Sequence, residues 1–208
     1  MIYAVMVGVA IIGYLLGSIN TSIIFSKFKK TDIREHGSGN AGLTNTLRTF
    51  GKGAAVIVLL GDVLKGVIAI LLARLACNIF AIDMANEAAQ IAGVAAILGH
   101  NFPLYYGFKG GKGVLTSVTV LMMIEYKLAL CCLLIFIVIV AITRYVSLGS
   151  MLAAASFVVM VLALKRYDLL AFGIIVASML IFRHRSNIKR LIQGNENKLG
   201  QKKKEANA

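Results

Sequence analysis

Residues 36–48 (HGSGNAGLTNTLR) combine closely spaced glycines with hydroxyl, amide and arginine side chains. Glycines let consecutive backbone N–H groups converge on an anion, and arginine binds phosphate through paired hydrogen bonds. Gly37, Gly39 and Gly42 also match GxGxxG, but that dinucleotide fingerprint needs a preceding strand, and here an apolar run and a charged stretch precede it. We interpret the segment as a phosphate-binding loop; the alternative is a glycine-rich connecting turn.

A second polar segment covers residues 99–113 (GHNFPLYYGFKGGKG) and holds the only proline of the chain. Its FKGGKG core resembles the phosphate loop of nucleotide hydrolases. It fails that spacing, because Tyr106 stands where glycine is needed and Gly113 where a hydroxyl is needed. Lys109 and Lys112 still predict a flexible, cationic loop that is rich in hydrogen-bond donors. The alternative is that these lysines only set the orientation of the chain in the membrane, which would explain the charge of the segment but not its glycines.

The third segment, residues 183–198 (RHRSNIKRLIQGNENK), follows the last apolar run. His184 and Asn187 are three residues apart and would share one face of a helix. A basic stretch attracted to anionic lipid is the alternative, but it has no use for His184, Asn187 or Glu196. Together the three segments predict a site for one or more phosphate groups, placed where a lipid tail can also reach.

The elements that position these segments are predicted to be membrane-spanning helices. The chain is 59% hydrophobic and only 15% charged, whereas soluble domains average about 45–50% apolar and about 25% charged residues. A helical span needs roughly 20 mostly apolar residues, so the sequence predicts an all-α, polytopic integral membrane protein with about seven transmembrane helices. The predicted spans are Ile2–Phe25, Gly53–Ala76, Ala85–Leu98, Val114–Ile124, Leu128–Thr143, Leu148–Leu164 and Leu169–Phe182. Residues 1–200 are predicted to form a single transmembrane domain, and 201–208 a basic, disordered cytoplasmic tail.

The distribution of positive charge predicts the orientation. Lysine and arginine accumulate in cytoplasmic loops. With the N-terminus outside, the predicted outer loops hold few of the 22 lysines and arginines, namely Arg74, Lys127, Lys165 and Arg166. The C-terminus and all three polar segments are then cytoplasmic.

Two features lie inside the predicted spans. Asp62 and Lys65 are three residues apart and share a helix face. Intramembrane charges are costly, usually paired and often functional, although a buried ion pair that fixes helix packing explains them equally well. Gly13 and Gly17 form a GxxxG pair, which predicts a close helix contact.

Composition excludes several other classes of protein. The net charge of +13 does not indicate nucleic-acid binding, because the basic residues lie at the ends of apolar runs and no recognition motif accompanies them. The cysteines have no CxxC spacing and predict neither disulfides nor a zinc site; they are Cys77, Cys131 and Cys132. We expect no cofactor and no metal.

The three polar segments resemble those of the acyl-phosphate:glycerol-3-phosphate acyltransferases, the PlsY family of bacterial inner membranes. The resemblance covers roughly residues 1–200 and rests on GSGNAGLTNTLRTFG, GHNFPLYYGFKGGKG and RHRSNIKRLIQGNENK, in that order. It implies a seven-span enzyme with its active site on the cytoplasmic face. This enzyme would transfer a fatty acyl group from acyl phosphate to the 1-hydroxyl of glycerol 3-phosphate, giving lysophosphatidic acid and phosphate. No acyl-CoA or acyl carrier protein is expected as donor, and the acyltransferase signature HxxxxD is absent, because Tyr105 follows His100 and Lys189 follows His184 at that spacing.

The resemblance also implies the roles of individual residues. The catalytic residues would be Ser38, Arg48, His184 and Asn187. The substrate-binding residues would be Gly37, Gly39, Asn40, Thr44, Asn45, His100, Lys109, Gly110, Gly111, Lys112, Gly113 and Glu196. His184 could act as a general base; we favour a role in orienting substrate, with a substrate phosphate accepting the proton. Glu196 is expected to brace the third segment by pairing with a nearby lysine or arginine.

A transporter of a phosphorylated metabolite is the competing interpretation, because cationic segments broken by glycine would suit one. No repeat of one half of the chain in the other is visible, and no outward-facing counterpart of the cationic segments exists in the sequence. A non-enzymatic membrane scaffold would leave the histidine and asparagine positions unexplained.

Overall fold

The computed structural model describes residues 1–200, and every regular element in that range is a helix. The predicted all-α class is therefore confirmed. The chain forms two compact units, unit 1 from Met1 to Lys127 and unit 2 from Leu128 onward, and each is described by itself. The single domain predicted for residues 1–200 stays a prediction, and the predicted tail at 201–208 lies outside the described residues.

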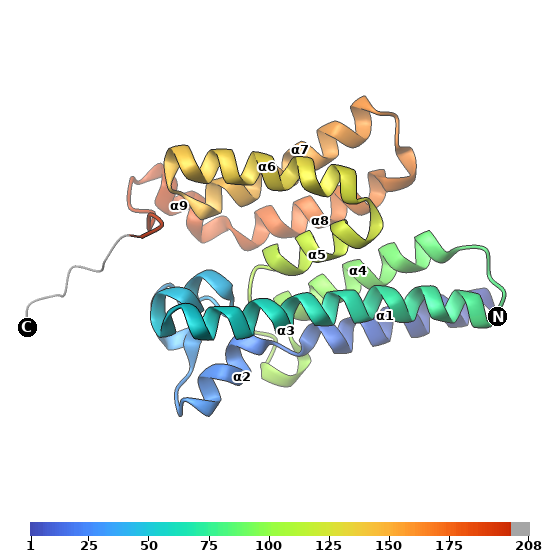
Figure 1. Cartoon of the computed structure of the whole chain (residues 1–208), viewed down its shortest axis with the longest axis horizontal. Helices are drawn as coiled ribbons and strands as arrows, with labels where there is room; N and C mark the ends of the chain where they lie inside the picture. The colour runs from blue at the N-terminus through green and yellow to red at the C-terminus, as the bar shows by residue number, and fades with distance from the viewer. Residues whose placement is uncertain (201–208) are drawn as a thin grey trace, which may run out of the picture. The chain divides into compact units, whose positions relative to one another are not determined.

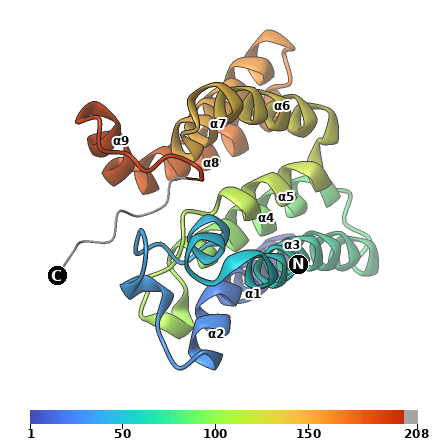
Figure 2. The ribbon, with the colours of Figure 1, turned by 60° about the vertical axis from the view of Figure 1, so that its left-hand side comes forward.

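Unit 1 is built around three long helices. Figures 1 and 2 both show α1, α3 and α4 side by side. The shorter helix α5 packs against α3 and α4. The elements of unit 1 are α1 (Ile2–Ser18), α2 (Thr21–Phe28), η1 (Ile33–Glu35), α3 (Leu43–Ile79), α4 (Ala85–Asn101), η2 (Leu104–Tyr106) and α5 (Val114–Ile124).

The first predicted span, Ile2–Phe25, is broken rather than continuous. α1 ends at Ser18, and the side chain of Asn20 caps α2 by accepting a hydrogen bond from the Ile23 N–H at 3.1 Å. Asparagine is a favoured N-cap residue because its short side chain replaces a backbone acceptor. The Ile23 N–H bonds to this side chain, and the chain turns between the two helices.

Helix α3 contains a kink at Gly51, which separates its first two turns, next to the glycine loop, from the long helix that follows. Gly51 has φ 83° and ψ −173°, so the stretch from Leu43 to Phe50 is a separate helical segment ahead of the long one. Such backbone angles suit glycine, which lacks a Cβ. The sequence predicted a span from Gly53 and a loop before it, but the polar residues Thr44, Asn45 and Arg48 lie on a helix. Hydropathy does not detect this segment because most of its residues are polar.

The predicted GxxxG contact is confirmed as the packing of α1 on α4. A Cβ added to Gly17 would overlap the carbonyl oxygen of Ala96, and one added to Gly13 would lie 2.7 Å from the carbonyl oxygen of Ala92. The two backbones therefore approach as closely as the absence of side chains permits.

The outer surface of α3 is apolar, and its inner surface carries charge. Leucines at positions 60, 64, 71 and 75 are exposed, whereas Asp62 and Lys65 are buried among small residues. A soluble helix has the opposite arrangement. A helix in contact with lipid has this arrangement, because lipid tails solvate leucine side chains well and charged side chains poorly.

Unit 2 contains three apolar helices and a short polar one, α6 (Tyr126–Thr143), α7 (Val146–Ala163), α8 (Leu170–Arg183) and α9 (Arg185–Ile192), with η3 (Tyr167–Leu169) ahead of α8. The rings of Phe157 and Phe172 join α7 to α8 edge to face, with centroids 6.2 Å apart. After α8 the chain bends by 58° into α9. His184 occupies the junction between these two helices.

Each predicted span has a helix at its position, and α5 matches its predicted bounds. Within residues 1–200, four helical stretches are long and apolar enough to cross a membrane, and the bent pair of α8 and α9 would be a fifth. At 11 residues α5 is short for a crossing. The count of seven crossings stays a prediction.

The contact of α1 with α4 predicts opposite effects at two glycines of α1. Replacing a helical glycine by alanine normally stabilises a helix by up to about 1 kcal/mol, and Gly8 has no heavy atom within 4 Å of the place a Cβ would take. Gly8→Ala should therefore keep or raise the apparent unfolding temperature in detergent. Gly17→Ala should lower it, because overpacking costs about 1–3 kcal/mol. Equal shifts in the two variants would contradict the packing.

Candidate active site

The first glycine segment forms a loop that is held in shape by Asn45. The side chain of Asn45 accepts the Ser38 N–H at 2.8 Å and donates to the carbonyl oxygens of Ile33 and His36 at 3.2 and 2.9 Å. Gly37 has φ 60°, and a Cβ there would overlap Asn45 Oδ1. Asn45 is 1% exposed. In this conformation it shapes the loop from within, and its predicted contact with substrate stays a prediction.

Two side chains of the first segment that could bind phosphate face solvent. Ser38 is exposed on the loop, and Arg48 is exposed one helical turn beyond Asn45. The loop leads into the N-terminus of α3 at Leu43. N–H groups at the start of a helix favour an anion. An exposed hydroxyl and guanidinium near that helix end form a suitable surface for phosphate.

The second glycine segment folds back onto the end of α4. The N–H of Gly110 donates to the carbonyl of Asn101 at 3.3 Å, and the N–H of Gly111 donates to the carbonyl of His100 at 3.1 Å. Lys109 is exposed, and Lys112 is half-buried. The glycines let the backbone press against α4 while both lysines remain within reach of a ligand.

Arg34 joins the two loops, a contact that the sequence did not predict. Its Nη1 donates to the carbonyl oxygens of Tyr106 at 3.0 Å and Lys109 at 3.2 Å. Its guanidinium also pairs with Asp32, at 2.6 Å from Nη2 to Oδ2. Hydrogen bonds from Arg34 hold the pKa of the Asp32 carboxyl below its ordinary value. Lys27 adds a cation–π contact, 5.1 Å from the centre of the Tyr106 ring.

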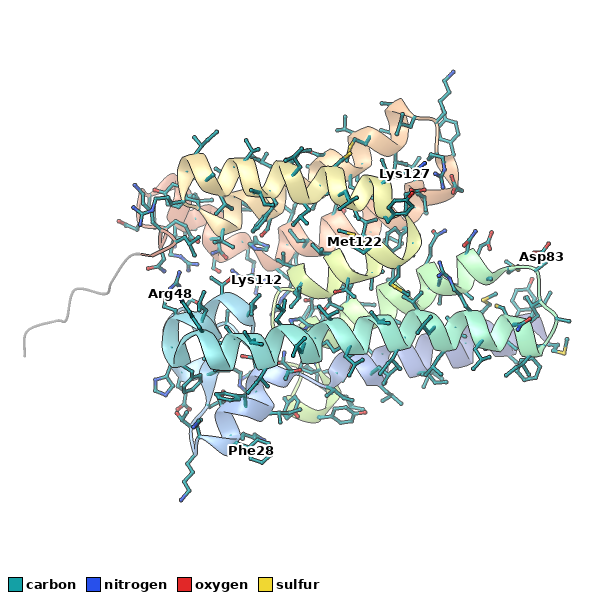
Figure 3. The ribbon with its side chains drawn as sticks, in the orientation of Figure 1. Phe28, Arg48, Asp83, Lys112, Met122 and Lys127 are labelled. Atoms are coloured by element: carbon teal, nitrogen blue, oxygen red, sulfur yellow. The ribbon has the colours of Figure 1, made fainter. Side chains whose placement is uncertain are left out.

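Two cations of the candidate site lie at one end of unit 1. Figure 3 shows Arg48 and Lys112 at the same end of unit 1, with Asp83 at the opposite end near the N-terminus. His100 lies beneath this surface, 3% exposed, with Nδ1 2.9 Å from Lys65 Nζ. Its predicted contact with substrate stays a prediction.

In unit 2, His184 is 2% exposed, and its ring Nδ1 lies 2.8 Å from the carbonyl oxygen of Leu180. A carbonyl oxygen only accepts, so Nδ1 carries the proton of this hydrogen bond. In the neutral ring, Nε2 is then the basic nitrogen. This tautomer suits a group that accepts a hydrogen bond from a substrate hydroxyl.

Glu196 connects three side chains of unit 2. Its Oε1 accepts from Ser147 at 2.8 Å and from Asn187 at 2.6 Å, and its Oε2 accepts from Arg190 at 2.7 Å. The predicted bracing by a nearby basic residue is therefore confirmed. Burial raises the pKa of Glu196, but the hydrogen bonds from Asn187, Arg190 and Ser147 outweigh it and leave the pKa below its ordinary value.

The predicted site residues thus fall into two sets. Ser38, Arg48 and the two glycine loops belong to unit 1, and His184, Asn187 and Glu196 belong to unit 2. Within unit 1 Arg34 joins the two loops, and within unit 2 Asn187 binds Glu196. Among residues 1–200, no group of three or more histidine, cysteine or acidic residues is placed to hold a metal ion.

Comparison with known proteins decides the family. A family model described as glycerol-3-phosphate acyltransferase matches residues 7–194. The chain belongs to the glycerol-3-phosphate acyltransferase family. It is 47% identical over 202 residues to a glycerol-3-phosphate acyltransferase of Thermoanaerobacter sp. (strain X514), with 96% of this chain and 98% of the relative covered. The corresponding protein of Halalkalibacterium halodurans is 50% identical over 196 residues, with 91% and 93% covered.

Two solved structures of the family are similar to this chain. One is the crystal structure of PlsY, an integral membrane glycerol 3-phosphate acyltransferase, in its glycerol 3-phosphate form. It has 38% sequence identity and a TM-score of 0.84, and covers 94% of this chain and 96% of its own. The lysophosphatidic acid form has 37% identity and a TM-score of 0.81, with 94% and 95% covered. The protein is thus an integral membrane member of the family.

The lowered pKa of Glu196 predicts how acid destabilises unit 2. A carboxyl whose pKa is lower in the folded state stabilises the fold above its ordinary value of 4.5, and this stabilisation is lost as the pH falls through the folded-state pKa. Glu196→Gln should be less stable than the parent at pH 7, and the difference should shrink on acidification below that value. Apparent unfolding temperatures in detergent across this range measure it.

Glu35→Gln is the control, because Glu35 is exposed and lies in the other unit. Its apparent unfolding temperature at pH 7 should match that of the parent. A constant difference between Glu196→Gln and the parent at all pH values would contradict the assignment.

Proposed function

We propose that this chain transfers a fatty acyl group from acyl phosphate to the 1-hydroxyl of glycerol 3-phosphate, giving lysophosphatidic acid and phosphate. Family membership supports the enzyme class, and the forms in which the PlsY crystal structures were solved support the acceptor and the product. The structural observation that carries the proposal is the pair of glycine loops in unit 1, tied together by Arg34 next to three accessible cations, Arg48, Lys109 and Lys112. The transporter alternative has no comparable support.

The reaction requires stabilisation of the negative charge that develops during attack, and it requires no covalent intermediate with the enzyme. Acyl phosphate is a mixed anhydride and is already activated. The 1-hydroxyl oxygen attacks the acyl carbon, the bond from that carbon to the phosphate oxygen breaks, and phosphate leaves with the electron pair. The hydroxyl proton passes to a phosphate oxygen. Cations and N–H donors fixed in advance around the developing negative charge lower the barrier, and fixed positioning of the two substrates adds to this.

The roles proposed for the residues are those that the resemblance to the family implies. Arg48 and the two lysines bind phosphate groups, and Ser38 donates from the exposed loop. His184 orients the acceptor hydroxyl through Nε2, and Asn187 is held in place for the same task by Glu196. Substrate phosphate takes the proton in this scheme, so His184 needs no change of charge during the reaction.

Acyl phosphate, rather than acyl-CoA or acyl carrier protein, is the proposed donor. In the described part of unit 1, the groups suited to binding are the cations and N–H donors of the two glycine loops, which match a donor whose polar part is a single phosphate. The active site is proposed to face the cytoplasm in a bacterial inner membrane. The excess of basic residues on the same side as the glycine loops supports this orientation.

Donor choice is tested with purified protein in detergent or lipid mesophase. Phosphate release from palmitoyl phosphate should require glycerol 3-phosphate and should match lysophosphatidic acid in amount. Palmitoyl-CoA, run in parallel, should give no product. Turnover with palmitoyl-CoA alone would keep the enzyme class and reject the proposed donor. A folded sample inactive with both donors would contradict the proposed function.

The role of Arg48 is tested against a neighbouring cation. Arg48→Met should lower kcat/KM by about 100-fold or more, since removing one donor to a developing negative charge typically costs that much. Lys52→Met is the matched control, because Lys52 is also exposed and lies four residues on, beyond the kink at Gly51. The control should remain active. A fully active Arg48→Met variant, or equal losses in the two variants, would contradict the assignment.

A further inference from the structure

The ammonium group of Lys65 lies inside unit 1 with all three of its N–H bonds used. Its Nζ is 2.8 Å from Asp62 Oδ1, 2.9 Å from the carbonyl oxygen of Ile19 and 2.9 Å from His100 Nδ1. Asp62, Lys65 and His100 are 0%, 4% and 3% exposed. A buried charge without partners is costly, so the three acceptors are what make this position tolerable.

The Ile19 carbonyl is available because the helix breaks there. In a continuous helix it would accept from the N–H of residue 23, but that N–H bonds to the side chain of Asn20 instead. Thr21 adds a hydrogen bond to Asp62 Oδ1 at 3.3 Å. The break between α1 and α2 is thus fastened to α3 through the ion pair.

These contacts determine which nitrogen of His100 carries its proton. An ammonium has three donors and no acceptor, so Nδ1 of His100 must accept from Lys65. The reverse arrangement, a neutral lysine beside a charged histidine, is disfavoured because lysine is much the stronger base. The histidine is then neutral and carries its proton on Nε2.

Nε2 of His100 faces the place where the two glycine loops meet. A Cβ added to Gly111 would overlap His100 Nε2 and would lie 2.5 Å from the carbonyl oxygen of Ala41, in the first loop. Gly111 also donates its N–H to the His100 carbonyl. Ala41 is held by Asn20, whose Nδ2 donates to its carbonyl at 3.3 Å. Both loops therefore contact residues that are linked to Lys65 through His100 and the break between α1 and α2.

We propose that Lys65, neutralised by Asp62, is a positioning residue for catalysis. It fixes His100 as the Nε2–H tautomer and thereby holds the two glycine loops in register for phosphate. Neither Lys65 nor Asp62 touches substrate in this account. The inference rests on the proposed function of the loops, but the state of His100 can be measured without any activity.

The tautomer is measured by nitrogen-15 NMR on protein with labelled histidine in lipid. The signals of His36 and His184 are assigned by their loss in His36→Gln and His184→Gln, which leaves those of His100. A bare, pyridine-type Nδ1 and a pyrrole-type Nε2–H are expected for His100. A protonated Nδ1, in either the neutral or the charged ring, would overturn the proposal and would say nothing against the acyltransferase activity.

Kinetics test the consequence for the site. The double variant Asp62→Asn/Lys65→Met removes both charges, so no buried ion is left without a partner. We expect its kcat/KM for glycerol 3-phosphate to fall by about 100-fold, mostly through a higher KM, because displaced loops bind phosphate poorly. The nitrogen-15 signals of His100 should at the same time change to those of a tautomer mixture.

Arg74→Met is the matched control, since it removes another cation of α3. Arg74 Nη2 donates to the carbonyl of Met123 at 2.7 Å, away from both loops. This variant should keep the parent KM. An equal rise of KM in both variants, or a double variant with unchanged KM and unchanged His100 signals, would overturn the proposal.

Discussion

A charged ammonium within an apolar helix bundle requires an acceptor for each of its N–H bonds. In unit 1 the three acceptors of Lys65 come from three different places, the carboxylate of Asp62 one turn earlier on α3, the carbonyl freed at the break after α1, and the ring of His100 at the end of α4. Much of the local architecture follows from this requirement. The first helix must break where Asn20 can cap the next one, and α4 must end where its histidine reaches α3.

The glycines place the polar loops against this charged centre. Gly17 brings the backbones of α1 and α4 into contact, and Gly111 brings the second loop against His100 and Ala41. A side chain at Gly17 would push α1 away from α4, and one at Gly111 would push the second loop away from His100. Lys109, which faces solvent, lies on the loop that packs against His100. Packing of this kind favours catalysis by positioning, which suits an acyl donor that is already activated.

The sequence predicted the positions of the helices well, because a lipid-facing helix must be apolar over most of its length. The bounds of α5 agree because the GGKG loop ends at Gly113 and a polar glutamate follows Ile124. Polar helical residues were harder to predict. Thr44, Asn45 and Arg48 lie on a helix that hydropathy does not distinguish from a loop.

The contacts that shape the candidate site were only partly predictable. Periodicity along one helix revealed the pair of Asp62 and Lys65, and the expectation that Glu196 would pair with a basic neighbour came with the family resemblance. Arg34 reaches Tyr106 across 72 positions of the chain, and Lys65 reaches His100 across 35. One sequence contains no periodicity that relates such distant residues. The partners of Asn45 were missed for another reason, since its type and position suit substrate binding and loop capping equally well.

The central claim is that the acceptor hydroxyl attacks the acyl carbon and not the phosphorus of the donor. It is tested most directly with glycerol 3-phosphate that carries oxygen-18 in its 1-hydroxyl, reacted with palmitoyl phosphate and analysed by mass spectrometry. The account predicts that the label is retained in the lysophosphatidic acid and is absent from the released phosphate. Label found in a phosphate ester at carbon 1, with free palmitate as the other product, would show phosphoryl transfer and contradict the account.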